Sequence, residues 1–191
     1  PANPDGLRHY GATEWPEVEG AVQFALANGA KHIVLAGYSM GGSTIMAFME
    51  RSALAPAIGG LVLDAPVLDF GSTVDFQADQ RHAPSVLTKV GKWIASWRFD
   101  VEWGNLDYLE HADDLKVPVL LFHGTDDDET PIAESEELAE LRPDLVTFIP
   151  IAGAEHVRSW NADPAGYGFA VRSFFERLPW MAEGSSTRPA P

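Results

Sequence analysis

The sequence predicts an α/β fold in which a parallel β-sheet is flanked by helices. Apolar runs of strand length recur along the chain, at residues 33–36, 60–65, 117–122 and 146–151. Segments with apolar residues at helical spacing lie beside these runs. This alternation is the pattern of a parallel sheet wrapped by helices. The run at 117–122 is apolar without interruption, as in a strand covered on both faces.

A helix is expected before the first strand. Thr13 can cap this helix, Pro16 falls in its first turn, and Asn28 with Gly29 ends it. Its apolar face consists of Trp15, Val18, Val22 and Ala25. Ahead of it we find only a lead rich in Pro and Gly at residues 1–11, with no strand, and the chain does not begin with Met. We therefore expect the C-terminal part of a longer protein, or an incomplete gene product.

The first strand runs into a Gly-x-Ser-x-Gly motif that spans Gly37 to Gly41, with Ser39 at its centre. Three apolar residues at helical spacing follow directly: Ile45, Phe48 and Met49. A serine in such a strand-to-helix turn sits on strained backbone that small neighbours permit, and its hydroxyl projects above the edge of the sheet. The setting of strand, turn and helix therefore favours Ser39 as a nucleophile over a chance turn.

A serine nucleophile needs a general base and a group that orients this base, expected downstream in the order serine, acid, histidine. The acid candidates form a run of four carboxylates after the strand at 117–122: Asp126, Asp127, Asp128 and Glu129. Any of them could reach an imidazole, and Asp127 is our first choice. An acidic surface turn or a weak calcium site is the alternative interpretation of this run. Asp64, at the end of the strand at 60–65, is a rival acid.

His156 is the candidate base. Among the six histidines, it alone lies downstream of the acidic run on a loop that follows a strand. Histidine suits proton transfer because its unperturbed pKa lies near neutrality. We expect Trp160 and Asn161 to brace this loop, and His123, at a strand end, to support a turn through a hydrogen bond.

Three motifs together resemble those of the α/β-hydrolase superfamily, and the resemblance runs from about residue 10 to about residue 178. They are Gly37 to Gly42, the strand end His123-Gly124-Thr125 with Asp127 and Pro131 after it, and Gly153-Ala154-Glu155-His156. The resemblance implies that Ser39 is the nucleophile, Asp127 the acid and His156 the base. It also implies that the backbone N–H of Met40 is one donor of the oxyanion hole, whereas the other comes from a loop upstream of this chain.

The resemblance further implies one α/β-hydrolase domain over residues 1–183, incomplete at its N-terminus, with a cap-like helical insertion at residues 67–116. The alternative for the insertion is a single amphipathic helix that packs on the sheet edge, with an apolar face formed by Val86, Val90, Trp93, Ile94 and Trp97. Candidate substrate contacts are Tyr38, Trp93 and Trp97. The nucleophile strand should be central, so a missing N-terminal segment is expected to pair with its outer edge and complete the sheet.

The last predicted helix begins with Asp163 as its cap and Pro164 at its first position. Its apolar face is expected to pack against the rest of the domain, and consists of Tyr167, Val171, Phe174, Phe175 and Leu178. Residues 184–191 have the composition of a disordered tail.

Composition limits the partners of this chain. It has 191 residues, 46% of them hydrophobic, which suffices for one core, and no stretch reaches the length of about 20 apolar residues that a membrane span needs. A formal net charge of -15 disfavours binding to nucleic acid, whose phosphates would be repelled. The lack of cysteine excludes disulfides and thiolate metal sites. We expect no metal and no cofactor, and we favour a cytoplasmic location, with a signal peptide or anchor upstream left open.

These observations predict a serine hydrolase that cleaves a carboxylic ester of small or medium size through an acyl-enzyme. A serine peptidase or amidase that uses the same three residues is the second hypothesis. A catalytically inactive binding module is the third, because the expected loss of the N-terminal part removes one oxyanion donor, and such a loss lowers turnover by about 10²–10³.

Overall fold

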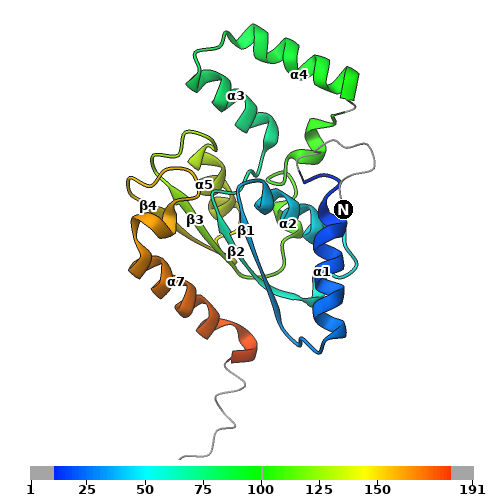
Figure 1. Cartoon of the computed structure of the whole chain (residues 1–191), viewed down its shortest axis with the longest axis vertical. Coiled ribbons are helices and arrows are strands. Elements are labelled where there is room, and N and C mark those ends of the chain that lie inside the picture. Colours follow the sequence, from blue (N-terminus) through cyan, green and yellow to red (C-terminus); the bar gives the residue numbers. More distant parts are fainter. Residues whose placement is uncertain (1–10, 100, 182–191) are drawn as a thin grey trace, which may run out of the picture.

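The computed structural model describes residues 11–99 and 101–181, and these residues form a four-stranded parallel sheet with helices on both faces (Figure 1). The strands are β1 (Ile33–Tyr38), β2 (Ile58–Asp64), β3 (Val119–Gly124) and β4 (Val146–Ile151), and they pair in the order β1-β2-β3-β4. Every neighbouring pair is parallel. The predicted α/β class with a parallel sheet is therefore confirmed, whereas the predicted tail at 184–191 and nearly all of the lead at 1–11 lie outside the described residues.

Side chains that alternate along the central strands divide the core into two layers. Leu61, Leu63, Val119 and Leu121 face one layer, together with residues from helices α1 (Trp15–Ala27), α2 (Met40–Arg51) and α5 (Ile132–Leu141). Val62, Leu120 and Phe122 face the other layer, which is covered by helix α7 (Pro164–Arg177). Figure 1 shows α7 on the side of the sheet opposite to α1 and α2. Burial on both faces explains why β3 is apolar without interruption.

The helix boundaries follow the predicted start and stop signals with one exception. Asp163 caps α7 by accepting a hydrogen bond from the backbone N–H of Gly166, as predicted. Thr13 does not cap α1, because Glu14 occupies the capping position. The longer side chain of Glu14 turns back and accepts hydrogen bonds from the N–H groups of Gly11 and Thr13. The prediction for Thr13 is therefore wrong, and a carboxylate one residue later satisfies backbone donors at this end.

Helices α3 (Phe70–Gln80) and α4 (Ser85–Phe99) follow β2 and form a pair that projects from one end of the molecule (Figure 1). Helix α4 packs against α3 and not on the sheet. The apolar residues expected to face the sheet edge are exposed to between 42% and 75%: Val86, Val90, Trp93, Ile94 and Trp97. The alternative prediction, that this helix packs its apolar face on the edge of the sheet, is therefore wrong. The side chains of α4 that face α3 are mostly smaller or polar ones.

The remaining short elements connect these layers. Helix α6 (Ser159–Ala162) precedes α7, and short 3₁₀ turns lie at Ala55–Ala57, Trp103–Leu106 and Ala112–Asp114. Within the described ranges, β1 is an edge strand that pairs with β2 alone. The same part of the chain contains no helix with both the length and the apolar character needed to cross a bilayer.

The contact between α2 and the loop after β2 generates a stability prediction. We expect Gly42→Ala to lower the free energy of unfolding by about 1–3 kcal/mol, because a Cβ atom at residue 42 would lie 2.5 Å from Cβ of Pro66. Gly41→Ala is the matched control on the same helix, since a Cβ atom there meets nothing within 4 Å. This control should be neutral or stabilise the helix by up to about 1 kcal/mol. Urea denaturation measures both, and an equal loss for the two variants would contradict the prediction.

Candidate active site

Ser39 occupies the tight turn between β1 and α2. Its backbone has φ 52° and ψ -126°, a conformation that L-residues rarely adopt. A Cβ atom at residue 37 would lie 2.7 Å from Cδ1 of Ile45, which can move, and 3.0 Å from the backbone carbonyl group of Gly41, which can move less, so a larger residue would crowd the turn. No such contact restricts Gly41. The small-neighbour explanation of the motif therefore holds for Gly37 and not for Gly41.

The structure brings Ser39, His156 and Asp127 together, although they are far apart along the chain. Nε2 of His156 lies 2.9 Å from Oγ of Ser39, and Nδ1 of the same ring lies 2.8 Å from Oδ2 of Asp127. Ser39 follows β1, Asp127 follows β3 and His156 follows β4. In the tautomer that satisfies both contacts, the Ser39 hydroxyl donates to Nε2 and Nδ1–H donates to Asp127. A proton can therefore pass from the hydroxyl to the imidazole while the carboxylate holds the ring.

Burial distinguishes Asp127 from its acidic neighbours. Its side chain is fully buried, whereas Asp126, Asp128 and Glu129 are exposed. Oδ1 accepts hydrogen bonds from the backbone N–H groups of Glu129 at 2.9 Å and Thr130 at 2.8 Å. Oδ2 also accepts from the Thr130 hydroxyl at 3.0 Å. The carboxylate is thus held in one orientation before any substrate arrives.

Electrostatics keep Asp127 ionised. Burial by itself would raise the pKa of this carboxyl. Hydrogen bonds from His123 and His156, and smaller contributions from the backbone N–H groups of Thr130 and Glu129, hold its pKa well below the usual range.

The pKa of His156 shifts in the opposite direction. Burial by itself would lower the pKa of the ring. The hydrogen bond to Asp127 and the negative charges of Asp127, Glu129 and Asp64 outweigh this effect and raise the pKa of His156 above its ordinary value of 6.5.

The rival acid, Asp64, points to a different partner. Its Oδ1 accepts a hydrogen bond from Oγ of Ser159 at 2.7 Å, and its Oδ2 is buried without a hydrogen-bond partner. Desolvation by burial raises the pKa of Asp64 despite the hydrogen bond from Ser159. Asp64 therefore links the end of β2 to the first residue of α6, next to the loop that carries His156. Nδ1 of His156 contacts Asp127 and not Asp64.

Sequence reasoning missed three polar residues around this relay: Thr130, Ser135 and Ser159. His123 is buried, with Nδ1 2.7 Å from Oγ of Ser135 and Nε2 3.2 Å from the carbonyl oxygen of Thr130. It supports the turn after β3, as expected, and its Nε2 also lies 3.3 Å from Oδ2 of Asp127. Thr130 contacts both Asp127 and His156. No spacing or motif singled out these hydroxyls, because only the folded chain brings Thr130 and Ser159 to the carboxylates and Ser135 to His123.

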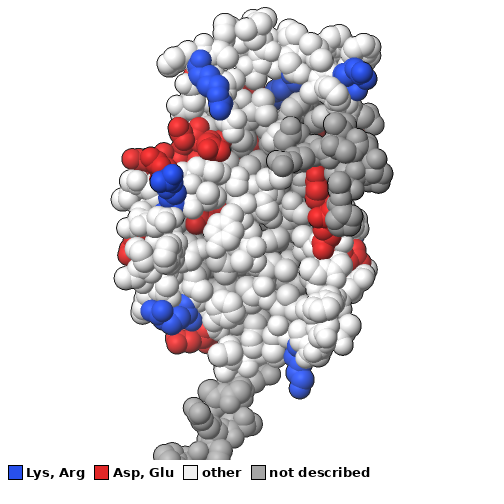
Figure 2. Space-filling view, viewed as in Figure 1, with Lys and Arg blue, Asp and Glu red and all other residues white. Residues whose placement is uncertain are grey.

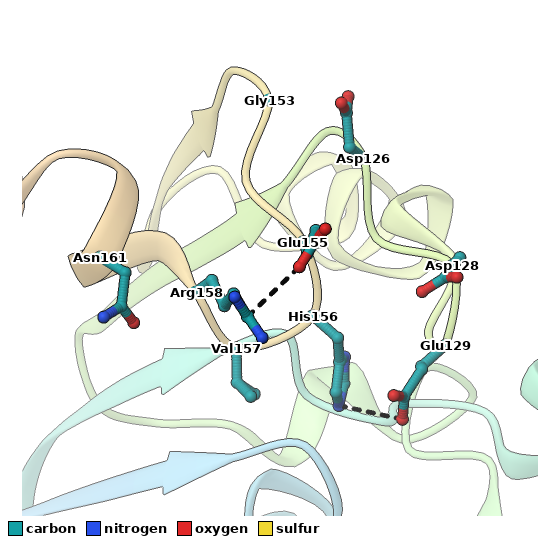
Figure 3. Close-up of a pocket in the computed structure, with 9 residues that line it drawn as sticks. All are labelled: Asp126, Asp128, Glu129, Gly153, Glu155, His156, Val157, Arg158 and Asn161. Atoms are coloured by element: carbon teal, nitrogen blue, oxygen red, sulfur yellow. Dashed lines mark ion pairs between the residues drawn. The ribbon is translucent and has the colours of Figure 1, made fainter.

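A cleft of about 690 Å³ opens beside His156 (Figure 3). Its lining is rich in carboxylates and comes from the loops after β3 and β4 and from α6: Asp126, Asp128, Glu129, Gly153, Glu155, Val157, Arg158 and Asn161. Figure 3 shows Glu155 turned toward Arg158, and their charged atoms approach to 3.3 Å. Glu129 reaches to 3.9 Å from Nε2 of His156. The lining therefore places more negative than positive charge next to the candidate base.

The other predicted site residues lie at different distances from this centre. Met40 is the first residue of α2, where the first backbone N–H groups of a helix lack intrahelical partners. Tyr38 is 52% exposed and adjoins Ser39. Trp93 and Trp97 are exposed on α4 and are not among the residues that line the cleft beside His156. Contact of these three side chains with a substrate stays a prediction. In the described ranges, no group of three or more His, Asp or Glu side chains is placed to hold a metal ion.

Known proteins of similar structure cover most of this chain. An esterase of Pyrococcus furiosus matches 90% of the chain with a TM-score of 0.67 and 21% identity, and a puromycin-hydrolyzing peptidase of Mycobacterium tuberculosis matches 88% with a TM-score of 0.64 and 19% identity. An esterase of a Rhodococcus species matches 90% with a TM-score of 0.59 and 19% identity. The chain spans 64%, 26% and 74% of these three proteins, respectively. At such identities the likeness shows the α/β-hydrolase fold.

The family is shown by the sequence itself. Among curated proteins, none matches the chain at a significant level. The family model of the prolyl oligopeptidase family matches residues 5–144, a range that includes Ser39 and Asp127 and ends before His156. Because this match covers well over half of the chain and the fold agrees with it, the chain belongs to the prolyl oligopeptidase family, within the α/β-hydrolase superfamily.

Proposed function

We propose that this protein is a serine hydrolase that cleaves carboxylic esters, with Ser39 as nucleophile, His156 as general base and acid, and Asp127 as the group that orients the imidazole. The observation that supports this proposal above all is the continuous hydrogen-bonded relay from Oγ of Ser39 through His156 to Asp127. Its two distances of 2.9 Å and 2.8 Å lie within the reach needed for proton transfer.

In the proposed reaction, Oγ of Ser39 attacks the ester carbonyl carbon while Nε2 of His156 takes the hydroxyl proton. The imidazolium that forms is stabilised by Asp127, and it then protonates the departing alcohol. Water repeats the sequence on the acyl-enzyme, with His156 again as the base, which releases the carboxylic acid and restores Ser39. The backbone N–H of Met40 is the proposed donor to the oxyanion, and a second donor would come from residues upstream of this chain.

A serine peptidase or amidase on the same three residues is the second candidate. The match to the prolyl oligopeptidase family and the likeness to a puromycin-hydrolyzing peptidase favour it. The two candidates differ in the leaving group, because an amine must be protonated as it departs whereas an alkoxide leaves more readily. For both candidates, the carboxylates that line the cleft disfavour a substrate with an anionic group next to the scissile bond.

The nucleophile is tested by labelling and turnover in the full-length protein. A fluorophosphonate probe should label the wild type and not Ser39→Ala, and p-nitrophenyl butyrate should be hydrolysed faster than an aminoacyl p-nitroanilide. Ser85→Ala, which removes an exposed serine at the start of α4, is the matched control and should keep wild-type labelling. A folded wild type that neither reacts with the probe nor hydrolyses either substrate would support an inactive binding module instead. Faster turnover of the anilide would favour the peptidase.

The two candidate acids are separated by paired substitutions. Asp127→Asn should lower kcat by about 10⁴, because the amide favours the wrong tautomer of His156 and cannot stabilise its charge. Asp64→Asn should lower kcat far less, since the amide oxygen can still accept the hydrogen bond from Ser159. Steady-state kinetics and thermal unfolding of both variants provide the measurement. A larger loss for Asp64→Asn at unchanged stability would assign the orienting role to Asp64.

The pH profile tests the electrostatics of His156. Only the neutral imidazole can accept the Ser39 proton, and the pKa of His156 is raised above 6.5, so kcat/KM should fall as the pH drops through a midpoint above 6.5. Glu129→Gln removes a negative charge that raises the pKa of His156, so this midpoint should move to lower pH. Asp126→Asn is the control and should move the midpoint less, because Asp126 is not among the charges that raise the pKa of His156. A wild-type midpoint below 6.5, or equal shifts in both variants, would contradict this account.

A further inference from the structure

Helix α4 presents its apolar side to solvent. We define the α4 stripe as the exposed apolar residues on its outer side: Val86, Val90, Trp93, Ile94 and Trp97. Trp93 and Trp97 are exposed to 66% and 75%, and their rings stack with centroids 6.3 Å apart. None of the 15 residues of α4 is buried. Such a contiguous exposed apolar surface marks an interaction site on a folded protein.

The inward side of α4 explains why the stripe faces outward. Nζ of Lys92 donates hydrogen bonds to the carbonyl oxygen of Gly71 at 3.1 Å and to Asp75 at 3.0 Å, and lies 5.2 Å from the ring centroid of Trp103. Oγ of Ser96 accepts from Nε1 of Trp103 at 2.9 Å. These polar contacts fix the rotation of the helix about its axis. The exposure of the stripe is therefore held in place by the fold.

Charge on α4 is opposite to that of the whole chain. The helix carries Lys89, Lys92 and Arg98 and no acidic residue, whereas the chain has a formal net charge of -15. Lys89 and Arg98 are exposed and flank the stripe on either side of the helix. Figure 2 shows basic side chains at the end of the molecule formed by α3 and α4, whereas acidic clusters and further basic side chains lie over the body. Helix α4 therefore combines an apolar face containing tryptophan with basic margins.

We propose that the α4 stripe docks on a lipid surface rich in anionic headgroups. A helix of this composition lies in the interface plane, with its apolar face at the boundary between headgroups and acyl chains and its basic side chains against lipid phosphates. Tryptophan rings favour this boundary because they combine an apolar body with a polar N–H. The long stems of Lys89 and Arg98 can lie along the apolar margin while their charges reach the headgroups.

A second copy of the chain fits the stripe less well than a lipid surface does. Two α4 helices that met through their stripes would bring basic margins together without an acidic partner on either helix, and facing like charges oppose association. An anionic lipid surface contacts the apolar side and the basic margins of α4 at once, and α4 itself carries no acidic residue. The net charge of -15 resides on other elements, and salt screens the repulsion between those exposed charges and the surface beyond about 10 Å. This complementarity is the reason for choosing lipid as the occupant.

Docking through α4 would hold the candidate active site close to the lipid surface. Helix α3 begins after the carboxyl end of β2, at the edge of the sheet where Ser39 and Asp127 also lie. Nε2 of Gln77 on α3 donates to the carbonyl oxygen of Glu129, which belongs to the acidic loop of the cleft. The helix pair and the cleft are therefore joined directly. The docking itself does not depend on what the site hydrolyses.

The experiment measures binding of the full chain to vesicles by co-sedimentation, in the Ser39→Ala background and without substrate, so that failure of the proposed hydrolase activity cannot affect the result. We expect binding to vesicles of phosphatidylcholine with an equal part of phosphatidylglycerol, and much weaker binding to phosphatidylcholine alone. The double variant Trp93→Gln/Trp97→Gln should lose about tenfold or more in partition coefficient. Lys89→Glu/Arg98→Glu should lose about fivefold or more for each residue, on anionic vesicles only.

The matched control is Phe24→Gln/Phe169→Gln, which removes two aromatic side chains that are exposed to 72% and 66% on α1 and α7. This control should bind as the parent does, and circular dichroism should show that all variants are folded. No binding of the folded parent to anionic vesicles would overturn the proposal, as would an equal loss in the control. A dimer in sedimentation velocity that the Trp93→Gln/Trp97→Gln change dissociates, without vesicle binding by the parent, would show that the stripe is an interface between copies.

Discussion

Parallel pairing of β1 to β4 is the constraint on which the rest of this structure depends. Because parallel strands end at the same edge, the turn after β1 and the loops after β3 and β4 emerge side by side. That arrangement alone allows Ser39, Asp127 and His156 to meet across more than a hundred residues of chain. The hydrogen bond from the backbone N–H of Ser39 to the carbonyl oxygen of Asp64, at 3.1 Å, extends the pairing of β1 with β2 into the strained turn itself.

Two buried carboxylates at this edge show how surroundings assign roles to the same functional group. Asp127 accepts several hydrogen bonds and contacts two histidines, so it stays ionised beside His156. Asp64 accepts one hydrogen bond, from Ser159, and keeps an unpartnered oxygen, so burial raises the pKa of its carboxyl. The first arrangement suits stabilisation of an imidazolium. The second suits the positioning of the segment that follows the histidine.

The α3–α4 pair departs from the usual relation between apolar patterning and burial. The spacing of Val86, Val90, Trp93 and Trp97 correctly indicates one face of a helix, but that face points away from the protein. Polar anchoring by Lys92 and Ser96 decides the orientation. Periodicity therefore shows that a face exists, and it does not show which partner covers it.

The sequence by itself determined the α/β class, the Gly-x-Ser-x-Gly turn and the start of α7 after its cap, Asp163, because strand, turn and cap signals are local. It also singled out Ser39 and His156 as candidates for the relay, because each lies in a turn or loop that follows a strand. Only the tertiary structure decided the choice of Asp127 on physical grounds, since four adjacent carboxylates differ in burial and hydrogen bonding and not in chemistry. It also supplied Thr130, Ser135 and Ser159, whose hydroxyls reach Asp127, His123 and Asp64 only in the folded chain. The outward face of α4 likewise depends on contacts with α3 and Trp103. Long-range packing, which leaves no mark on local spacing, accounts for each of these.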